Sequence, residues 1–386
     1  MRFRAGAALA LLALLATACG SREAGGPGAG QVGGAEASGA EDEATAASAG
    51  TDAAEGTEAA ADCTPGTTGR IAFMLKQQTA FRYLHADVPF FQRTAEEAGY
   101  EVLVQSAEND ADNQVAQAEN VITQGVDAIV IQPVDFNVAA GIAELARDAG
   151  IPLVSYDDLI LDAEHAAFVG RDPREGGGSA AQAVTEAVPN GNYVLIGGDP
   201  GQTGSTQMQE GYHEVLDPLV EAGDITIVAD QFTRAWKTEP AQANAENALT
   251  ANDNDVDAFL VSYDGMSLGV LQAIEQAGLE PGSIPVTGQD MELAAAQAIV
   301  EGRMFGSVWP APDEMAVRGA EVAVALAECR PVDFDTTIDN GAGEVPWAKT
   351  PIYLVGREDM EEFMCSHRHW LSIDEVYANV DDKPSC

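Results

Sequence analysis

Residues 99–132 read GYEVLVQSAENDADNQVAQAENVITQGVDAIVIQ and contain a complete strand–helix–strand unit. The runs Val102–Gln105 and Ala128–Gln132 have the length of strands, and Ala111–Thr123 between them has the apolar spacing of a helix. Gly99 and Gly125 each follow a helical stretch, where glycine readily adopts the left-handed conformation that ends a helix. Because nearly continuous apolar strands are buried on both faces, the unit predicts a parallel sheet covered by helices.

The same alternation continues on both sides of this unit. Similar junctions occur at Gly150 and Gly278. We predict further strands at 71–75, 153–156, 193–196, 225–230, 258–262, 286–287 and 304–308, and further helices at 138–148, 241–250, 268–276 and 315–327. A chain of this length exceeds the size that a single hydrophobic core usually supports, so two domains are expected. The predicted fold class is therefore α/β, with two doubly wound parallel-sheet lobes joined by a multi-strand hinge.

The first 18 residues have the features of a secretory signal peptide. Arg2 and Arg4 precede an apolar stretch that is too short to cross a bilayer, and small residues follow it up to Cys19. This end also resembles a bacterial lipobox, so we predict that Cys19 is lipidated; an ordinary cleaved signal peptide is the alternative. Residues 19–62 predict a disordered acidic tether. The expected location is outside the cell, anchored to the outer face of the cell membrane or in the periplasm.

The formal net charge of −43 argues against nucleic acid as a partner. It resembles the charge of proteins from salt-adapted organisms. Four cysteines follow Cys19 and could form two disulfides in three alternative pairings: Cys63, Cys329, Cys365 and Cys386. A zinc site is the competing use of cysteine, but there is no CxxC pair, and we predict neither a metal nor a cofactor.

Polar and aromatic residues follow the predicted strands, at the sheet edge where ligands bind in parallel α/β folds. Carboxylates accept hydrogen bonds from hydroxyl groups, arginine donates, and aromatic rings cover C–H faces, so this set suits a neutral polyol. Any one aspartate could instead cap a helix, and Trp236 could instead be a core residue. The predicted ligand-binding residues are Arg82, Tyr83, Asp157, Asp158, Asp172, Trp236, Tyr263, Asp264 and Asp290.

Four segments resemble bacterial periplasmic D-xylose-binding proteins of the ribose-binding superfamily: EVLVQSA at 101–107, GNYVLIGG at 191–198, ENALTANDN at 246–254 and GQD at 288–290. The resemblance extends over nearly all of residues 69–350. It implies a type I periplasmic binding protein fold and a monomeric solute-binding protein of an ABC transporter. Such a protein binds a monosaccharide between its lobes, closes about a hinge, and delivers the sugar to a permease in the membrane.

The resemblance also implies the lobe boundaries. The N-terminal lobe would comprise residues 69–171 and 290–330, and the C-terminal lobe residues 172–289 and 331–386. The hinge strands would lie near Gly170–Pro173, Gly288–Met291 and Arg330–Phe334.

Several site residues match the family's pattern and four positions depart from it. Arg82 and Tyr83 match an Arg-aromatic pair, and Trp236 matches a stacking tryptophan. Asp157, Asp172 and Asp290 match sugar-binding aspartates. The departures are Asp158 in place of Arg, Pro173 and Tyr263 each in place of Asn, and Pro310 in place of Lys. Losing the Arg and the Lys predicts a cavity poor in donors, so another monosaccharide, a larger glycoside or an amino sugar competes with xylose as ligand.

Two other functions would use the same residues. Asp157 and Asp158 could act as acid and base on a glycoside, but adjacent residues at a strand end point apart and no nucleophile accompanies them, so we predict no enzyme. A ligand receptor for a sensor kinase or chemoreceptor is also compatible with the sequence, because the docking surfaces of such proteins have no readable motif.

Overall fold

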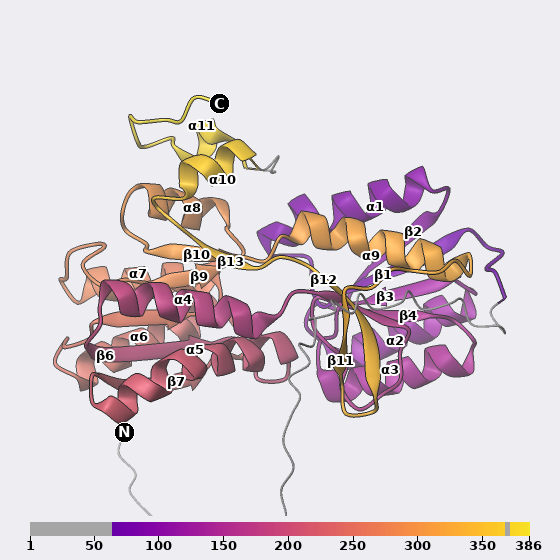
Figure 1. Cartoon of the computed structure of the whole chain (residues 1–386), viewed down its shortest axis with the longest axis horizontal. Helices are drawn as coiled ribbons and strands as arrows, with labels where there is room; N and C mark the ends of the chain where they lie inside the picture. Colours follow the sequence, from indigo (N-terminus) through magenta and orange to yellow (C-terminus); the bar gives the residue numbers. More distant parts are fainter. Residues whose placement is uncertain (1–63, 367–370) are drawn as a thin grey trace, which may run out of the picture. The chain divides into compact units, whose positions relative to one another are not determined.

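The computed structural model describes residues 64–366 and 371–386 (Figure 1). The predicted signal peptide, the lipidation site Cys19, the tether and Cys63 lie outside the described residues. Among the residues that are described, no helix is both long enough and apolar enough to span a bilayer.

Seven strands form the first sheet, in the order β11-β12-β5-β4-β3-β1-β2. Neighbouring strands are parallel, except that β11 is antiparallel to β12. The bounds are β1 Arg70–Leu75, β2 Glu101–Ser106, β3 Ala128–Ile131, β4 Leu153–Tyr156, β5 Ala167–Gly170, β11 Thr336–Asp339 and β12 Glu344–Lys349.

Side chains of β1 alternate between two apolar cores, as a strand buried on both faces requires. Ile71 and Phe73 belong to one core, and Ala72 and Met74 belong to the other. Helices α1 (Val88–Glu97) and α9 (Pro312–Ala327) cover the first core, and α2 (Ala111–Thr123) and α3 (Phe136–Asp148) cover the second (Figure 1). The first strand group is thus doubly covered, as predicted.

The second strand group consists of two three-stranded ladders, β7-β6-β8 and β13-β10-β9. A bridge from Phe259 to Val286 joins the two ladders. Neighbouring strands are again parallel, except that β13 is antiparallel to β10. The bounds are β6 Gly191–Gly197, β7 Ile225–Phe232, β8 Ala258–Val261, β9 Thr287–Gln289, β10 Gly306–Trp309 and β13 Tyr353–Gly356.

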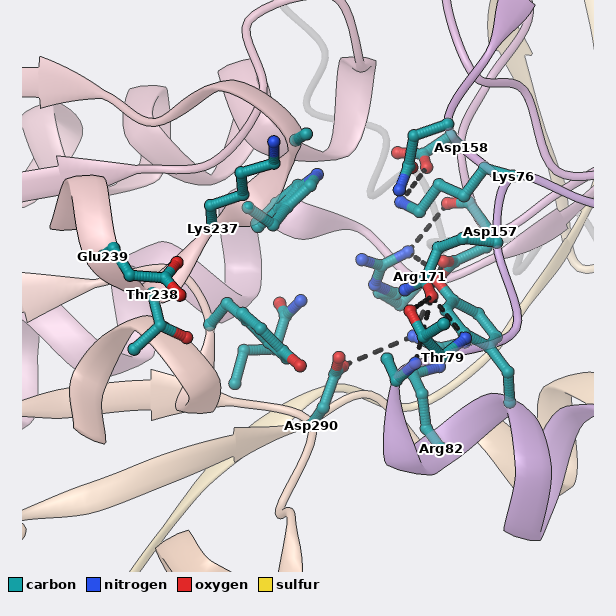
Figure 2. A pocket seen from close by; sticks show the side chains of 18 residues that line it. Lys76, Thr79, Arg82, Asp157, Asp158, Arg171, Lys237, Thr238, Glu239 and Asp290 are labelled. Atoms are coloured by element: carbon teal, nitrogen blue, oxygen red, sulfur yellow. Dashed lines mark hydrogen bonds and ion pairs between the residues drawn. The ribbon is translucent and has the colours of Figure 1, made fainter. Parts of the chain in front are cut away.

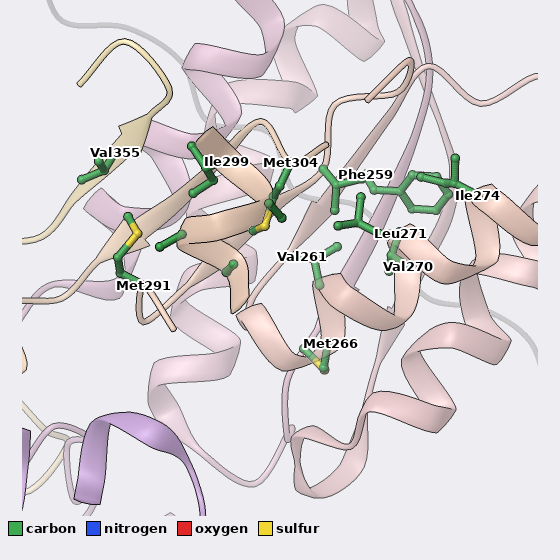
Figure 3. Packing of buried hydrophobic residues seen from close by; sticks show 14 of the residues in the cluster. Phe259, Val261, Met266, Val270, Leu271, Ile274, Met291, Ile299, Met304 and Val355 are labelled. Atoms are coloured by element: carbon green, nitrogen blue, oxygen red, sulfur yellow. The ribbon is translucent and has the colours of Figure 1, made fainter. Parts of the chain in front are cut away.

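Helices cover both faces of this group as well. Phe259 and Val261 pack with helices α6 (Thr238–Ala251), α7 (Asp264–Gln276) and α8 (Leu293–Val300), as Figure 3 shows for part of the core. Ala258 and Leu260 pack with α4 (Pro173–Ala187) and α5 (Thr203–Ala222) on the opposite face. The glycines of α4 allow close packing there, because a β carbon on Gly177 would lie 2.2 Å from the carbonyl oxygen of Met208.

Three segments connect the two strand groups: β5 to α4 through Gly170–Pro173, β10 to α9 at residues 309–312, and β12 to β13 at residues 349–353. The first coincides with a predicted hinge strand, and the other two differ from the prediction. Residues 290–309 lie with the second group, because the apolar face of α8 is buried in its core. Residues 336–349 lie with the first group, because β12 pairs with β5.

The C-terminal residues pack on the second group. Helices α10 (Met360–Ser366) and α11 (Ile373–Val376) contribute Phe363 and Val376 to its core. A disulfide joins Cys365 to Cys386. Of the three predicted pairings, this bond is compatible only with the one that pairs Cys63 with Cys329, and Cys63 lies outside the described residues.

Candidate functional site

A cavity of about 280 Å³ lies at the carboxyl ends of strands from both groups. This is the edge at which open parallel sheets bind ligands. In Figure 2, Lys76, Asp157 and Arg171 approach the cavity from the first group, and Lys237, Thr238 and Asp290 approach it from the second.

Seven of the nine predicted ligand-binding residues line this cavity: Arg82, Tyr83, Asp157, Asp158, Trp236, Tyr263 and Asp290. They come from segments that are far apart in the sequence. The fold brings them together because each segment follows the carboxyl end of a strand. The structure does not place Asp172 and Asp264 in the cavity wall.

Both of these aspartates have local structural partners instead. The Asp172 carboxylate accepts a hydrogen bond from the Arg174 backbone N–H at 3.0 Å and so caps α4. Asp264 is fully buried, and its carboxylate accepts from the Ser307 hydroxyl at 2.8 Å and from the Glu292 backbone N–H at 2.7 Å.

Asp157 is the centre of the charged network in the first group. Its carboxylate accepts hydrogen bonds from the Arg171 guanidinium and, at 2.6 Å, from the Gln132 amide, and it lies 3.5 Å from Arg82 Nη1. Burial alone would raise the pKa of Asp157, but Arg171, Arg82 and Lys76 together hold its pKa well below the ordinary value. Asp157 is therefore a carboxylate whose charge the protein already compensates.

Arg82 joins the two strand groups. It donates two hydrogen bonds to Asp87, at 3.0 and 2.8 Å, in the bidentate geometry that fixes a guanidinium plane. Its Nη1 also lies 3.4 Å from the carboxylate of Asp290, which belongs to the second group. Burial raises the pKa of Asp290, although the positive charge of Arg82 opposes the shift. The Asp290 carboxylate thus lies where it can either bind a proton or accept a hydrogen bond from a ligand hydroxyl group.

Asp158 has its own partners. Its carboxylate lies 3.1 Å from Lys76 Nζ and accepts a hydrogen bond from the Gly204 backbone N–H at 2.8 Å. Side chains of both residues in this ion pair are less than a tenth exposed. Asp157 and Asp158 are thus each paired with a cationic side chain of the protein, Arg171 and Lys76 respectively.

Aromatic rings form the wall contributed by the second group. Trp236 and Tyr263 meet edge to face, with ring centroids 6.3 Å apart. A β carbon on Gly198 would lie 2.1 Å from the Trp236 ring, so glycine is required there for the ring to occupy its position. The Tyr263 hydroxyl donates to Glu292 at 2.8 Å, which leaves its ring toward the cavity.

Two of the residues that line the cavity, Arg171 and Gln289, each contain one buried side-chain atom, Nε and Oε1, that has no hydrogen-bond partner within the described part of the chain. The protein covers both atoms, and a buried polar atom without a partner costs free energy. The Arg171 guanidinium can donate and the Gln289 amide can donate and accept, which are the functions that bind sugar hydroxyl groups.

The expectation of a donor-poor cavity was wrong. Lys76 and Arg171 supply the donors that were thought to be missing, and Gln289 adds an amide. Lys76 directly follows β1, and Arg171 directly follows β5, so the rule that found the aspartates could have found them. The charged residues that line the cavity balance, with four basic side chains and four acidic ones.

No group of His, Cys, Asp and Glu with the geometry of a metal site occurs within residues 64–366 and 371–386. The chemistry that the cavity offers is hydrogen bonding and ring contact.

Comparison with known proteins places this chain in a family. A profile of the periplasmic binding protein domain matches residues 71–330. The D-xylose-binding periplasmic protein of Escherichia coli K12 is 36% identical over 260 residues, which cover 67% of this chain and 78% of that protein. The multiple sugar-binding periplasmic receptor of Rhizobium radiobacter is 30% identical over 276 residues, covering 66% of this chain and 78% of the receptor.

Solved structures agree on the fold. An ABC transporter solute-binding protein from Clostridium phytofermentans, solved with bound β-D-glucose, has a TM-score of 0.73 at 24% identity and covers 80% of this chain and 99% of its own. The two sequence relatives are named as a periplasmic sugar-binding protein and a periplasmic sugar-binding receptor, which agrees with the prediction that the chain is not an enzyme. The chain belongs to the periplasmic binding protein family and has its type I fold.

Proposed function

We propose that the chain is an exported solute-binding lipoprotein of an ABC transporter, which binds a neutral monosaccharide in the cavity and delivers it to the membrane permease. The observation that carries the proposal is the pairing of an aromatic wall, Trp236, with hydrogen-bonding side chains that line the same cavity, Arg171 and Gln289. A pyranose presents C–H faces and hydroxyl groups together and satisfies both features.

The charge balance of the cavity supports a neutral ligand. Its four basic and four acidic side chains are largely paired with one another, as at Lys76 and Asp158. A charged sugar would leave one charge of the cavity or of the ligand uncompensated in a buried site, which is costly. We therefore rank neutral pentoses and hexoses above amino sugars and sugar acids, and xylose is the first candidate because a D-xylose-binding protein is 36% identical.

The other parts of the proposal follow from the family and the sequence. Closure of the two strand groups about the segments near residues 170, 310 and 350 would enclose the sugar, and the closed monomer would dock on the permease. Cys19 would carry the lipid anchor that keeps the protein at the outer face of the cell membrane.

Thermal-shift screening of the purified protein against neutral sugars, polyols, amino sugars and sugar acids tests the proposal. A ligand at 100 times its dissociation constant is expected to raise the free energy of unfolding by about 2.7 kcal/mol. The screen should be run at low and high salt, because the net charge of −43 makes the protein itself sensitive to ionic strength. Stabilisation by charged sugars alone, or by none of the four classes, would contradict the proposal.

A sensory role is the second candidate, because a relative that is 30% identical is named as a periplasmic receptor. Transport predicts adjacent genes for a permease and an ATPase, whereas a purely sensory role predicts a sensor kinase or chemoreceptor gene without them.

A further inference from the structure

A second polar cluster lies beside the cavity, formed by Lys76, Asp158, Gln202 and Trp236. Lys76 and Asp158 follow strands β1 and β4 of the first group. Gln202 and Trp236 belong to the second group, at the start of α5 and in the short helix η2 (Arg234–Trp236). The cluster therefore spans both strand groups, and only Gln202 does not itself line the cavity.

Gln202 is the residue on which the cluster converges. Its side-chain oxygen accepts from Lys76 Nζ at 2.7 Å and from the indole N–H of Trp236 at 2.8 Å. An amide oxygen has two lone pairs, and these two donors use both. The amide nitrogen faces the carbonyl oxygen of Val134 at 3.3 Å, so the orientation of the amide is defined by its partners on both sides.

The indole N–H is the one hydrogen-bond donor of the Trp236 ring, so its bond to Gln202 selects the rotation of that ring. Gly198 lies directly against the Trp236 ring, so the absence of a side chain there makes room for the ring. The Lys76 ammonium is 5.3 Å from the ring centroid, a cation–π distance that also depends on where Gln202 holds the lysine.

Helix α5 shows why Gln202 is available for this role. Gln202 occupies the position before the helix, yet its side chain makes no capping hydrogen bond. The capping contact comes from the other group instead, since the Asp158 carboxylate accepts from the Gly204 backbone N–H at 2.8 Å. A β carbon on Gly204 would lie 2.3 Å from that carboxylate oxygen, so the close approach depends on glycine.

We propose that Gln202 is the positioning residue of this site: it fixes the Trp236 ring in the orientation that covers a sugar, and it links that orientation to contact between the two strand groups through Lys76. The cap that Asp158 places on α5 holds the same two groups together. When the groups separate, Gln202 and Trp236 stay in the same group, but Gln202 loses its two partners from the first group, Lys76 and Val134, and with them the restraint on its amide orientation.

Three substitutions test the proposal. Gln202→Met removes the acceptor and keeps the length of the side chain. Gln202→Glu keeps an acceptor for both donors, and should restore what Met removes. Gln209→Met is the matched control, because Gln209 is also buried on α5 but bonds to Asp230 and does not line the cavity.

The ligand-free readout is the indole N–H resonance of Trp236 in a nitrogen-15 NMR spectrum, assigned by its loss in Trp236→Phe. In Gln202→Met, the resonance should move upfield and its exchange with water should accelerate about tenfold, as expected for a lost hydrogen bond. In Gln202→Glu and Gln209→Met, both quantities should stay close to wild type. An unchanged indole resonance in Gln202→Met would overturn the proposal.

The second readout is affinity for the sugar that stabilises the wild type, and this arm rests on the proposed function. We expect Gln202→Met to weaken binding about tenfold, and Gln202→Glu and Gln209→Met by less than about threefold. Equal losses in Gln202→Met and Gln209→Met would assign Gln202 a merely structural role. If no sugar binds the wild type, the proposed function fails, but the NMR comparison still decides the role of Gln202.

If Gln202→Met does not fold, Gln202→Asn replaces it, because it keeps an amide and withdraws the oxygen by one methylene. The same displaced indole resonance is then expected, and an unchanged resonance would again overturn the proposal.

Discussion

Replacing either of two buried aspartates, Asp157 or Asp264, by asparagine should change the free energy of unfolding in opposite directions. Both are at most 2% exposed, so solvent screens neither. Asp157 lies among guanidinium groups, whereas Asp264 accepts from the Ser307 hydroxyl and a backbone N–H and lies near other acids. Burial raises the pKa of Asp264 well above its ordinary value, and the neighbouring Glu292 adds to the shift.

The magnitude follows from what each substitution leaves unpaired. Asp157→Asn removes the anion that faces Arg171 and Arg82, and breaking a buried pair by removing one partner costs about 3–5 kcal/mol. Asp264→Asn removes no cationic partner. Its amide oxygen can still accept from Glu292 N–H, and its amide nitrogen can donate to the Ser307 hydroxyl, so we expect a change between about 0 and 1 kcal/mol in favour of folding.

The dependence on pH should also have opposite signs. The pKa of Asp157 is lowered in the folded protein, whereas in the unfolded chain it is about 4. The contribution of Asp157 to the free energy of unfolding is therefore complete above about pH 4 and is lost as pH falls toward the folded pKa. The pKa of Asp264 is raised, so its protonated form favours folding, and stability is lost as pH rises toward the folded pKa.

Chemical denaturation of the wild type and the two variants at pH 5 and pH 7 measures the effects of the substitutions, with the contribution of Asp157 complete at both pH values and that of Asp264 expected to differ between them. Asp157→Asn should lower the free energy of unfolding strongly at both pH values, whereas Asp264→Asn should be neutral or stabilising, and more so at pH 7. Equal destabilisation by the two substitutions would refute the assignment of their neighbours. A stabilising Asp157→Asn would refute the pairing with Arg171 and Arg82.

Substitutions outside the Asp157 cluster separate binding from stability. Asp172→Ala should lower the free energy of unfolding by about 1 kcal/mol through loss of the α4 cap. A change in sugar affinity, measured by titration, would instead show that Asp172 contributes to binding. Gly198→Ala should displace the Trp236 ring and weaken sugar binding at least about tenfold with little change in melting temperature, and unchanged affinity would contradict the position of the ring. His213→Gln should flatten the melting temperature between about pH 6 and pH 8. Burial lowers the pKa of His213, but its ion pairs with Asp217 and Asp230 raise the pKa overall. Its stabilising contribution is therefore present below about pH 6.5 and is lost as pH rises through the folded pKa. If the melting temperature of His213→Gln depends on pH as the wild type's does, these ion pairs do not contribute to stability.

The alternation of apolar strands and amphipathic helices was sufficient to predict the doubly covered sheets. Helix α2 has the predicted bounds, and β4 begins and ends where the sequence indicated. The hairpin β11-β12 and strand β13 were missed. Residues of β11 are largely exposed at a sheet edge, so they lack the apolar run by which the other strands were found.

The lobe boundaries were wrong because local pattern does not say which core a segment joins. Helices α8 and α9 are both apolar on one face and follow each other closely, yet α8 packs with the second group and α9 with the first. The turn between them, at Ala311 with φ of 45°, is flanked by Pro310 and Pro312, which signal a break in the chain but not which core the next helix joins.

The candidate site shows a similar division. The ends of the predicted strands correctly indicated seven residues that line the cavity. An aspartate at a strand end can instead cap the helix that follows it, as Asp172 does. Gln202 was missed because its role depends on a contact with Lys76, which lies 126 residues away in the sequence.

Binding of a neutral sugar in this cavity is tested most directly by titration calorimetry on the wild type, Gln289→Met and Asp172→Ala. Gln289 lines the cavity and its Oε1 has no partner within the described residues, so Gln289→Met should leave the melting temperature unchanged and weaken sugar binding about tenfold. Asp172→Ala should bind the sugar as tightly as the wild type. Full affinity in Gln289→Met, together with loss of affinity in Asp172→Ala, would contradict a sugar site in this cavity.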